Sequence, residues 1–298
     1  MIKMVVSDMD GTLLNKSGEI SKTNLEAIRY LIENHIEFVI ASGRDYQAAY
    51  SILNQHNLKC EAILGNGSQY VDERGNILMS CYMDKPTVIK VVDIFREFHI
   101  PYMIFATDGF YTGEDPLAMR TAFITRCQKE SGETPEDFEK GGKQEAMPCN
   151  QLQKVENFHE FLENDREIMK VEGFAIEESK SAAVKERLKS ISGISYLSSV
   201  HDNLEVTDKA AQKGYILQKV IQLRGISKEE VMVIGDGMND ISMFEIFPHS
   251  YAPSNAHDKI KQLASEIVCS NEEDGFAQAV HKVLEKDTLS CINSALTL

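Results

Sequence analysis

Short apolar segments alternate with longer amphipathic ones from the first residues of this chain, and that rhythm limits the folds it can adopt. Three apolar segments of strand length lie at residues 2–7, 37–40 and 62–64. Between them, residues 23–34 and 45–55 carry apolar side chains near helical spacing. Strands that alternate with helices in this way form βαβ units, whose strands run parallel. The pattern predicts an α/β protein built on a doubly wound, mostly parallel sheet.

The alternation of strands and helices changes in the middle of the chain, where strand and helix candidates are interrupted by a polar, glycine-containing stretch at residues 131–147. The alternation seen at the start of the chain then resumes. The elements expected after it are helices at 215–223, 258–264 and 276–285 and strands at 231–234 and 267–268. We therefore predict a Rossmann-like core formed by residues 1–82 and 207–298, and an inserted α/β domain formed by residues 83–206.

Composition and charge narrow the classes of partner. The 298 residues are 43% hydrophobic and 26% charged, as in an ordinary globular protein. The formal net charge of −15 argues against nucleic acid as the main partner, because binding to its phosphates relies on surplus Lys and Arg.

No apolar run reaches the roughly 18 residues that a membrane span needs, and the N-terminus lacks the long apolar region of a signal peptide. The six cysteines form no C-x-x-C pair, so we expect reduced thiols in a cytoplasmic protein without a structural zinc site.

Carboxylates follow two of the expected strands at the point where each strand ends. Asp8 and Asp10 follow the first strand, and Asp236 and Asp240 follow the strand at 231–234. Open α/β sheets bind ligands at these strand ends, and residues two apart in an extended chain project to the same side, so we expect Asp8 and Asp10 to face one pocket. Burying several ionised carboxylates is costly unless a cation compensates for their charge. Because Mg²⁺ prefers such oxygen ligands, the sequence predicts a magnesium site.

Groups that bind a phosphoryl anion are expected on neighbouring turns. Ser42 and Gly43 lie between a strand and a helix, where a hydroxyl and backbone N–H groups are available to an anion. Lys213 begins the helix after the insert and supplies a positive charge. Asn66, flanked by two glycines, lies on a further turn at the same edge. The alternative interpretations are structural: Ser42 caps the following helix, and Asn66 satisfies a tight turn.

The order of these residues resembles the four motifs of the haloacid dehalogenase superfamily. The matching segments are Asp8-Met9-Asp10-Gly11-Thr12-Leu13-Leu14, Ser42, Lys213 and Gly235-Asp236-Gly237-Met238-Asn239-Asp240. The large insert, preceded by Asn66 in Gly-Asn-Gly, is similar to that of the Cof-type branch (subclass IIB), whose sugar phosphatases carry an α/β cap. This resemblance covers nearly the whole chain.

The resemblance implies a role for each matching residue. Asp8 is expected to be the nucleophile and an Mg²⁺ ligand, and Asp10 the general acid and base, which also binds Mg²⁺ through its backbone carbonyl. The expected binding residues are Ser42 and Lys213 for the phosphoryl group, Asp236 for the metal, and Asn239 and Asp240 for the shell around metal and phosphate. Lys209 competes with Lys213 for the lysine of the third motif, but the Lys213-Gly214 pair favours Lys213.

The activity implied by this resemblance is Mg²⁺-dependent hydrolysis of small phosphomonoesters through an aspartyl-phosphate on Asp8. Sugar phosphates are the first candidates, and pyridoxal phosphate or flavin mononucleotide the next. The cap at residues 83–206 is expected to set specificity. The alternatives are a phosphomutase and a sugar-phosphate-binding protein without turnover, although a binder has no need of a nucleophile. The expected partner is thus a small phosphorylated metabolite, with neither nucleic acid nor membrane, and the expected assembly is a monomer or homodimer.

Overall fold

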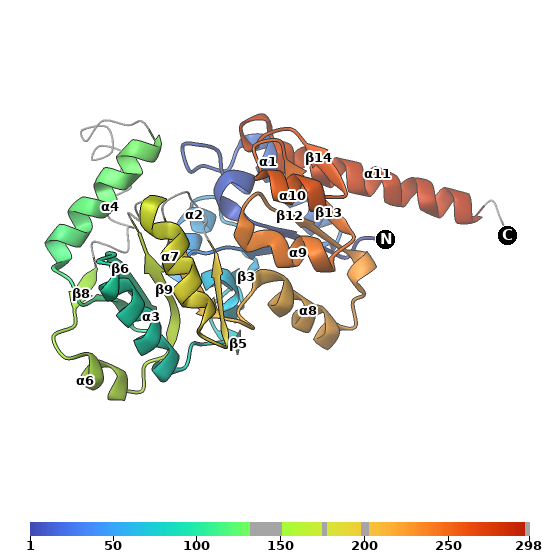
Figure 1. Ribbon diagram of the computed structural model, residues 1–298. Coiled ribbons are helices and arrows are strands. Elements are labelled where there is room, and N and C mark those ends of the chain that lie inside the picture. The colour runs from blue at the N-terminus through green and yellow to red at the C-terminus, as the bar shows by residue number, and fades with distance from the viewer. Residues whose placement is uncertain (132–150, 175–177, 198–202, 296–298) are drawn as a thin grey trace. The chain divides into compact units, whose positions relative to one another are not determined.

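A computed structural model describes residues 1–131, 151–174, 178–197 and 203–295. The chain divides into two compact units, the first formed by Met1–Ser80 with Gln212–Leu298 and the second by Cys81–Ala211 (Figure 1). The sequence placed these boundaries at residues 82 and 207. Strand β11 (Leu204–Asp208) pairs wholly within the second unit, which explains the later return to the first. Most of the polar stretch at 131–147 lies outside the described residues.

The first unit is built on an eight-stranded sheet in the order β14-β13-β12-β1-β2-β3-β4-β5. Its strands are β1 (Met4–Ser7), β2 (Glu37–Ala41), β3 (Glu61–Leu64), β4 (Gln69–Val71), β5 (Ile77–Ser80), β12 (Val231–Ile234), β13 (His249–Pro253) and β14 (Glu266–Val268). The neighbouring pairs from β14 to β3 are parallel, and at the other edge β4 pairs antiparallel with both β3 and β5. The predicted α/β class and doubly wound sheet are confirmed, also by the structural relatives reported below.

Helices pack against this sheet through apolar faces. They are α1 (Lys22–Glu33), α2 (Tyr46–Gln55), α8 (Lys213–Arg224), α9 (Ile241–Ile246), α10 (Asp258–Leu263) and α11 (Gly275–Ala295). Helix α1 begins where the Ser21 side chain accepts a hydrogen bond from the backbone of Asn24, and it buries Ile28 and Leu31 in the core. The sequence ended the last helix at Glu285, but α11 continues to Ala295 (Figure 1).

The strand order places two strand ends side by side at the centre of the sheet. From β1 the chain proceeds through β2 and β3 on one side, and β12, β13 and β14 lie on the other. Ser7 at the end of β1 pairs with Ile234 at the end of β12. The carboxyl ends of strands at such a topological switch point are where open α/β sheets bind ligands. The residues that follow, Asp8 and Asp236, therefore meet at one edge.

The second unit has its own six-stranded sheet, in the order β10-β11-β9-β6-β7-β8. Its remaining strands are β6 (Tyr102–Ala106), β7 (Gly109–Thr112), β8 (Leu152–Lys154), β9 (Ile168–Gly173) and β10 (Ile194–Leu197), and its helices are α3 (Lys85–Glu97), α4 (Pro116–Ser131), α6 (Phe158–Glu163) and α7 (Glu178–Lys189). Ile104, Val171 and Val206 lie in register on one face, in the same apolar cluster as residues of α3 and α7. This unit therefore has a separate core.

The other face of the second sheet carries buried charges. Glu172 and Glu205 lie directly opposite each other on β9 and β11, and Lys170 bonds to both, at 3.4 Å and 2.6 Å respectively. From its apolar neighbours, the sequence assigns Glu205 to an exposed strand position. That prediction is wrong, because Glu205 is only 6% exposed and forms a buried ion pair whose partner, Lys170, lies distant in the sequence. Asn203 is also buried, whereas its neighbours His201 and Asp202 lie outside the described residues.

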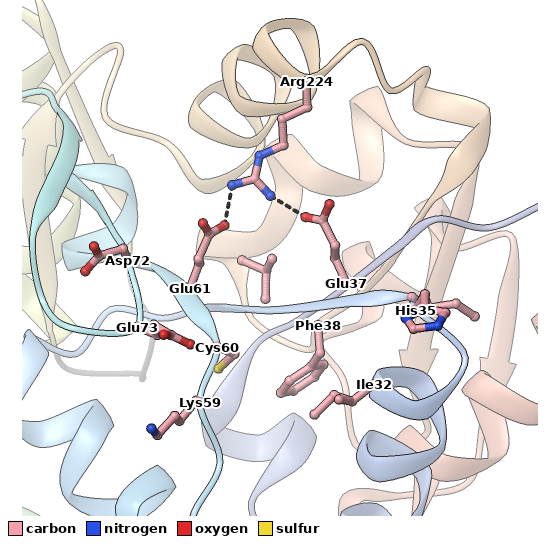
Figure 2. A pocket seen from close by; sticks show the side chains of 12 residues that line it. Ile32, His35, Glu37, Phe38, Lys59, Cys60, Glu61, Asp72, Glu73 and Arg224 are labelled. Atoms are coloured by element: carbon pink, nitrogen blue, oxygen red, sulfur yellow. Dashed lines mark hydrogen bonds and ion pairs between the residues drawn. The ribbon is translucent and has the colours of Figure 1, made fainter.

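A cavity of about 540 Å³ lies at the amino ends of the parallel strands, away from the carboxyl ends. Glu37 and Glu61, the first residues of β2 and β3, line it, and Figure 2 shows the guanidinium of Arg224 from α8 bound to both carboxylates. The contacts tie α8 to the starts of two strands. Among the described residues, no helix combines the length and apolar character needed to cross a membrane.

Candidate active site

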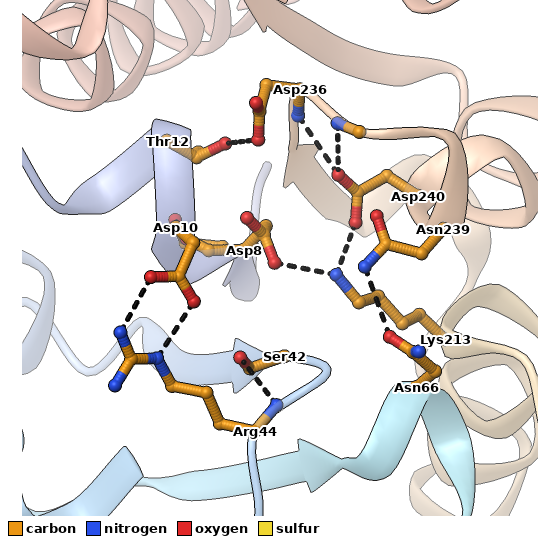
Figure 3. Close-up of polar contacts among 12 residues, drawn as sticks. Asp8, Asp10, Thr12, Ser42, Arg44, Asn66, Lys213, Asp236, Asn239 and Asp240 are labelled. Atoms are coloured by element: carbon orange, nitrogen blue, oxygen red, sulfur yellow. Dashed lines mark hydrogen bonds and ion pairs between the residues drawn. The ribbon is translucent and has the colours of Figure 1, made fainter. Parts of the chain in front are cut away.

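Lys213 connects two carboxylates at the carboxyl end of the first sheet (Figure 3). Its Nζ lies 2.6 Å from Oδ1 of Asp8 and 2.6 Å from Oδ1 of Asp240. Lys213 and Asp240 are fully buried, and Asp8 is only 5% exposed. Lys209, the competing lysine, is exposed and belongs to the second unit. Lys213 is therefore the lysine that contacts Asp8.

The loop after β12 completes an acidic cluster. Carboxylate oxygens of Asp8, Asp236 and Asp240 lie within 4.8 Å of one another. Thr12 donates a hydrogen bond of 2.9 Å to Oδ1 of Asp236. The φ of +73° at Gly11 suits glycine, and a Cβ there would lie 2.4 Å from Oδ2 of Asp236, so no side chain fits between the two loops.

Asp240 also shapes this loop. Its Oδ2 accepts hydrogen bonds from the backbone N–H groups of Asp236 and Gly237, each at 3.0 Å, while its Oδ1 binds Lys213. The carboxylate thus holds the turn and the lysine together. Its contribution to a metal site would come from lone pairs that these contacts leave available.

The charges in this cluster are poorly balanced within the protein. Burial, opposed by Lys213, raises the pKa of Asp8 well above its usual range, and the charges of Asp240 and Asp236 raise it further. Burial and the charge of Asp240 raise the pKa of Asp236 to about 7. Three carboxylates face one ammonium group, which leaves two negative charges if all are ionised. The donor set is all oxygen, so a hard divalent cation such as Mg²⁺ fits it.

Asp10 makes a different contact from Asp8. Its carboxylate is not in the acidic cluster; Arg44 binds both of its oxygens, Nε to Oδ2 at 2.8 Å and Nη2 to Oδ1 at 2.7 Å (Figure 3). The chain is not extended here as the sequence suggested, because β1 ends at Ser7 and the chain turns through Met9–Leu13, but the charge of Asp10 still acts on Asp8 and raises its pKa. The carboxylate of Asp10 is thus held by a different cation.

Ser42 and Gly43 form a tight turn after β2. The Oγ of Ser42 accepts a 3.2 Å hydrogen bond from the backbone of Arg44, and Asp45, not Ser42, caps α2 by accepting from Ala48. The capping interpretation of Ser42 is therefore wrong. A Cβ on Gly43 would lie 2.9 Å from Oδ1 of Asn66, so a side chain at this position would displace the Asn66 amide.

Asn66 links the two loops that flank Asp8. Its φ of 60° is left-handed, as the tight-turn interpretation requires, and its backbone N–H donates to the carbonyl of Ser42 at 3.0 Å. Its Oδ1 accepts a 3.1 Å hydrogen bond from Nδ2 of Asn239. The predicted residues Ser42, Gly43, Asn66 and Asn239 thus lie together on one side of the site (Figure 3).

The sequence predicted no role in the site for the side chains of Arg44 and Thr12. The position of Arg44 in the sequence could have indicated a role. A cation just before the first turn of α2 is unfavourable beside the positive end of the helix dipole, so a contact with an anion is expected to offset that repulsion. Thr12 lies inside the first motif, but only the fold brings its hydroxyl to Asp236, 224 positions away.

Comparisons with known proteins place the chain in a class. It belongs to the haloacid dehalogenase-like hydrolase family, whose sequence profile matches residues 5–280. Three relatives align with 95% of the chain. They are the phosphatase YwpJ of Bacillus subtilis, 26% identical and covered completely; the 5-amino-6-(5-phospho-D-ribitylamino)uracil phosphatase YwtE of the same organism, 26% identical and 98% covered; and the pyridoxal phosphate phosphatase YbhA of Escherichia coli, 25% identical and 98% covered.

A solved structure supports the same assignment. A haloacid dehalogenase-like hydrolase from B. subtilis superposes with a TM-score of 0.83 at 25% identity, over 94% of this chain and 99% of that one. The predicted membership of the haloacid dehalogenase superfamily is confirmed, and the chain is an enzyme of the phosphomonoester hydrolase class.

Proposed function

We propose that this enzyme hydrolyses small phosphomonoesters with the help of Mg²⁺, through an aspartyl-phosphate on Asp8. The observation that supports the proposal is the set of contacts made by the two carboxylate oxygens of Asp8. One of its oxygens is bound to Lys213, and Oδ2 accepts no hydrogen bond from the part of the chain that the structure describes. A carboxylate held at one oxygen and open at the other is suited to attack phosphorus.

The proposed reaction has two steps. Asp8 attacks the phosphorus atom, the P–O bond to the substrate alcohol breaks, and Asp10 gives a proton to the leaving oxygen. Asp10 then takes a proton from a water molecule, which attacks the phosphorus and releases inorganic phosphate from Asp8. Ser42, Gly43, Asn66 and Asn239 are the proposed donors to the phosphoryl oxygens, and Lys213 balances their charge.

The proposed cofactor follows from the charges around Asp8. A nucleophilic carboxylate must be ionised, yet burial raises the pKa of Asp8 well above its usual range and Lys213 is the only cation whose bond to it is recorded among the described residues. Asp8, the backbone carbonyl of Asp10 and Asp236 are the proposed ligands, with Asp240 beside them. A bound Mg²⁺ would supply positive charge that favours ionised Asp8 and offsets the charge of the phosphoryl group.

The proposed substrates are phosphorylated sugars, sugar alcohols and cofactors. Two relatives are named for such compounds, a ribityl phosphate and pyridoxal phosphate. We propose that the second unit acts as a cap that recognises the organic part of the substrate. Nothing in this assignment requires a nucleic acid or a membrane.

Phosphate release from a panel of sugar phosphates, pyridoxal phosphate and flavin mononucleotide tests the proposal. Hydrolysis is expected with Mg²⁺ and not with a chelator. Asp8→Asn should remove it, whereas Asp258→Asn, which changes an exposed carboxylate in the same unit, should not. Release that persists in the chelator or in Asp8→Asn would contradict the proposed chemistry.

A further inference from the structure

Arg44 and Asp10 form an ion pair whose geometry is more specific than a contribution to folding stability requires. The two parallel hydrogen bonds of 2.8 Å and 2.7 Å fix the direction of the carboxylate as well as its distance. The side chains are 31% and 59% exposed. An ion pair with this much solvent contact contributes little to folding. Its directional character is the feature that needs an explanation.

The backbone of Asp10 does little to orient its carboxylate. Asp10 lies in a turn, with a φ of −74° and a ψ of 125°, and Gly11 follows with a φ of +73°. An exposed Asp in such a turn samples several rotamers in the absence of a partner. In this protein the guanidinium selects one of them.

Arg44 is itself anchored to the turn proposed to bind phosphate. Its backbone N–H donates to Oγ of Ser42 at 3.2 Å, and its carbonyl accepts from the backbone of Gly65 at 2.9 Å. Burial alone would lower the pKa of Arg44, but the hydrogen bonds and charge of Asp10 outweigh it and raise the pKa, so the guanidinium stays charged. The same residue thus connects the Ser42 turn to the carboxylate of Asp10.

We propose that Arg44 is a positioning residue that aims Asp10 at the leaving-group oxygen of the substrate. This inference rests on the proposed function, in which Asp10 transfers the proton. If one of the two hydrogen bonds from Arg44 breaks, one carboxylate oxygen of Asp10 becomes available for the proton while the other stays bound to the guanidinium. A lysine cannot replace this fork, because an ammonium group is a point charge without the planar geometry of a guanidinium.

Two substrates whose leaving groups differ in basicity test the role of Arg44. An alkoxide is strongly basic and needs a proton as it departs, whereas p-nitrophenolate departs readily without one. Arg44→Met should therefore lower kcat/KM for an alkyl phosphate such as glycerol phosphate by roughly 100-fold, and that for p-nitrophenyl phosphate by less than about threefold. Arg44→Lys should resemble Arg44→Met. Arg29→Met, an exposed change on α1, is the matched control and should leave both values unchanged.

A double-mutant cycle separates positioning from direct phosphate binding. If Arg44 acts through Asp10, adding Arg44→Met to Asp10→Asn should lower kcat/KM no further. Equal losses with both substrates, full activity in Arg44→Lys, or losses that multiply in the double variant would overturn the inference. If the wild-type enzyme hydrolyses neither substrate, the proposed function fails; if it hydrolyses both and Arg44→Met matches the control, only the role of Arg44 fails.

Discussion

At the scale of single residues, Lys213 has the most demanding position in the molecule. It is fully buried between Asp8 and Asp240. Burial alone would lower its pKa, but the two carboxylates outweigh burial and raise it, so the ammonium form is the stable one. The sequence pointed to this lysine through its place in a motif order, but it left Lys209 open as a competitor, because only the fold shows which amine is buried beside Asp8.

Replacing Lys213 with Met should be strongly destabilising, because it leaves two buried carboxylates without their cation. Removing one partner of a buried ion pair typically costs about 3–5 kcal/mol, which urea denaturation of the variant would measure. Lys209→Met is the matched control, since substitutions of exposed residues usually change stability by less than about 0.5 kcal/mol. A Lys213→Met protein that unfolds at the same urea concentration as the wild type would contradict this account.

At the scale of elements, the sequence predicted the first unit better than the second. Parallel strands buried on both faces appear as plain apolar runs, as at Val231–Ile234, and their strand ends placed the acids correctly. The face of β9 and β11 was different: Lys170, Glu172 and Glu205 look exposed in sequence because charged residues usually are. Their burial depends on a cross-strand pairing that no local pattern encodes.

Lys170 should therefore be essential to the pairing of β9 with β11. Like charges directly opposite each other on adjacent strands destabilise a sheet. Burial alone would lower the pKa of Lys170, but the charges of Glu205 and Glu172 outweigh burial and raise the pKa to about 12. Lys170→Met should lower the free energy of unfolding by about 3–5 kcal/mol, measured by urea denaturation. Lys154→Met on β8, where the lysine is 45% exposed, should cost less than about 1 kcal/mol. Similar losses in both variants would refute this role.

At the scale of the whole molecule, the acidic site should make stability depend on pH and on metal. Asp236 has a folded-state pKa of about 7 against an ordinary value of 3.8. Between those values the folded protein holds a proton that the unfolded chain releases, so this group's contribution to stability falls as pH rises from about 4 to 7 and is constant above. Added Mg²⁺ should recover stability most at the upper end of that range.

Denaturation in a chelator at pH 5 and pH 7.5, for the wild type and Asp236→Asn, measures this effect. The variant should lose less stability than the wild type between the two pH values, and it should gain less from Mg²⁺. Identical pH dependence in the two proteins would show that Asp236 titrates normally and that the site carries no excess negative charge.

The identity of the residue that receives the phosphoryl group tests the central claim most directly. The enzyme would be mixed with a phosphomonoester, quenched in acid within a single turnover and digested, and mass spectrometry would locate the modification. The account predicts one phosphoryl group on Asp8 of the Asp8-Met9-Asp10 segment, and none in Asp8→Asn. Release of inorganic phosphate without any phosphorylated Asp8, or a phosphoryl group on another residue, would contradict it.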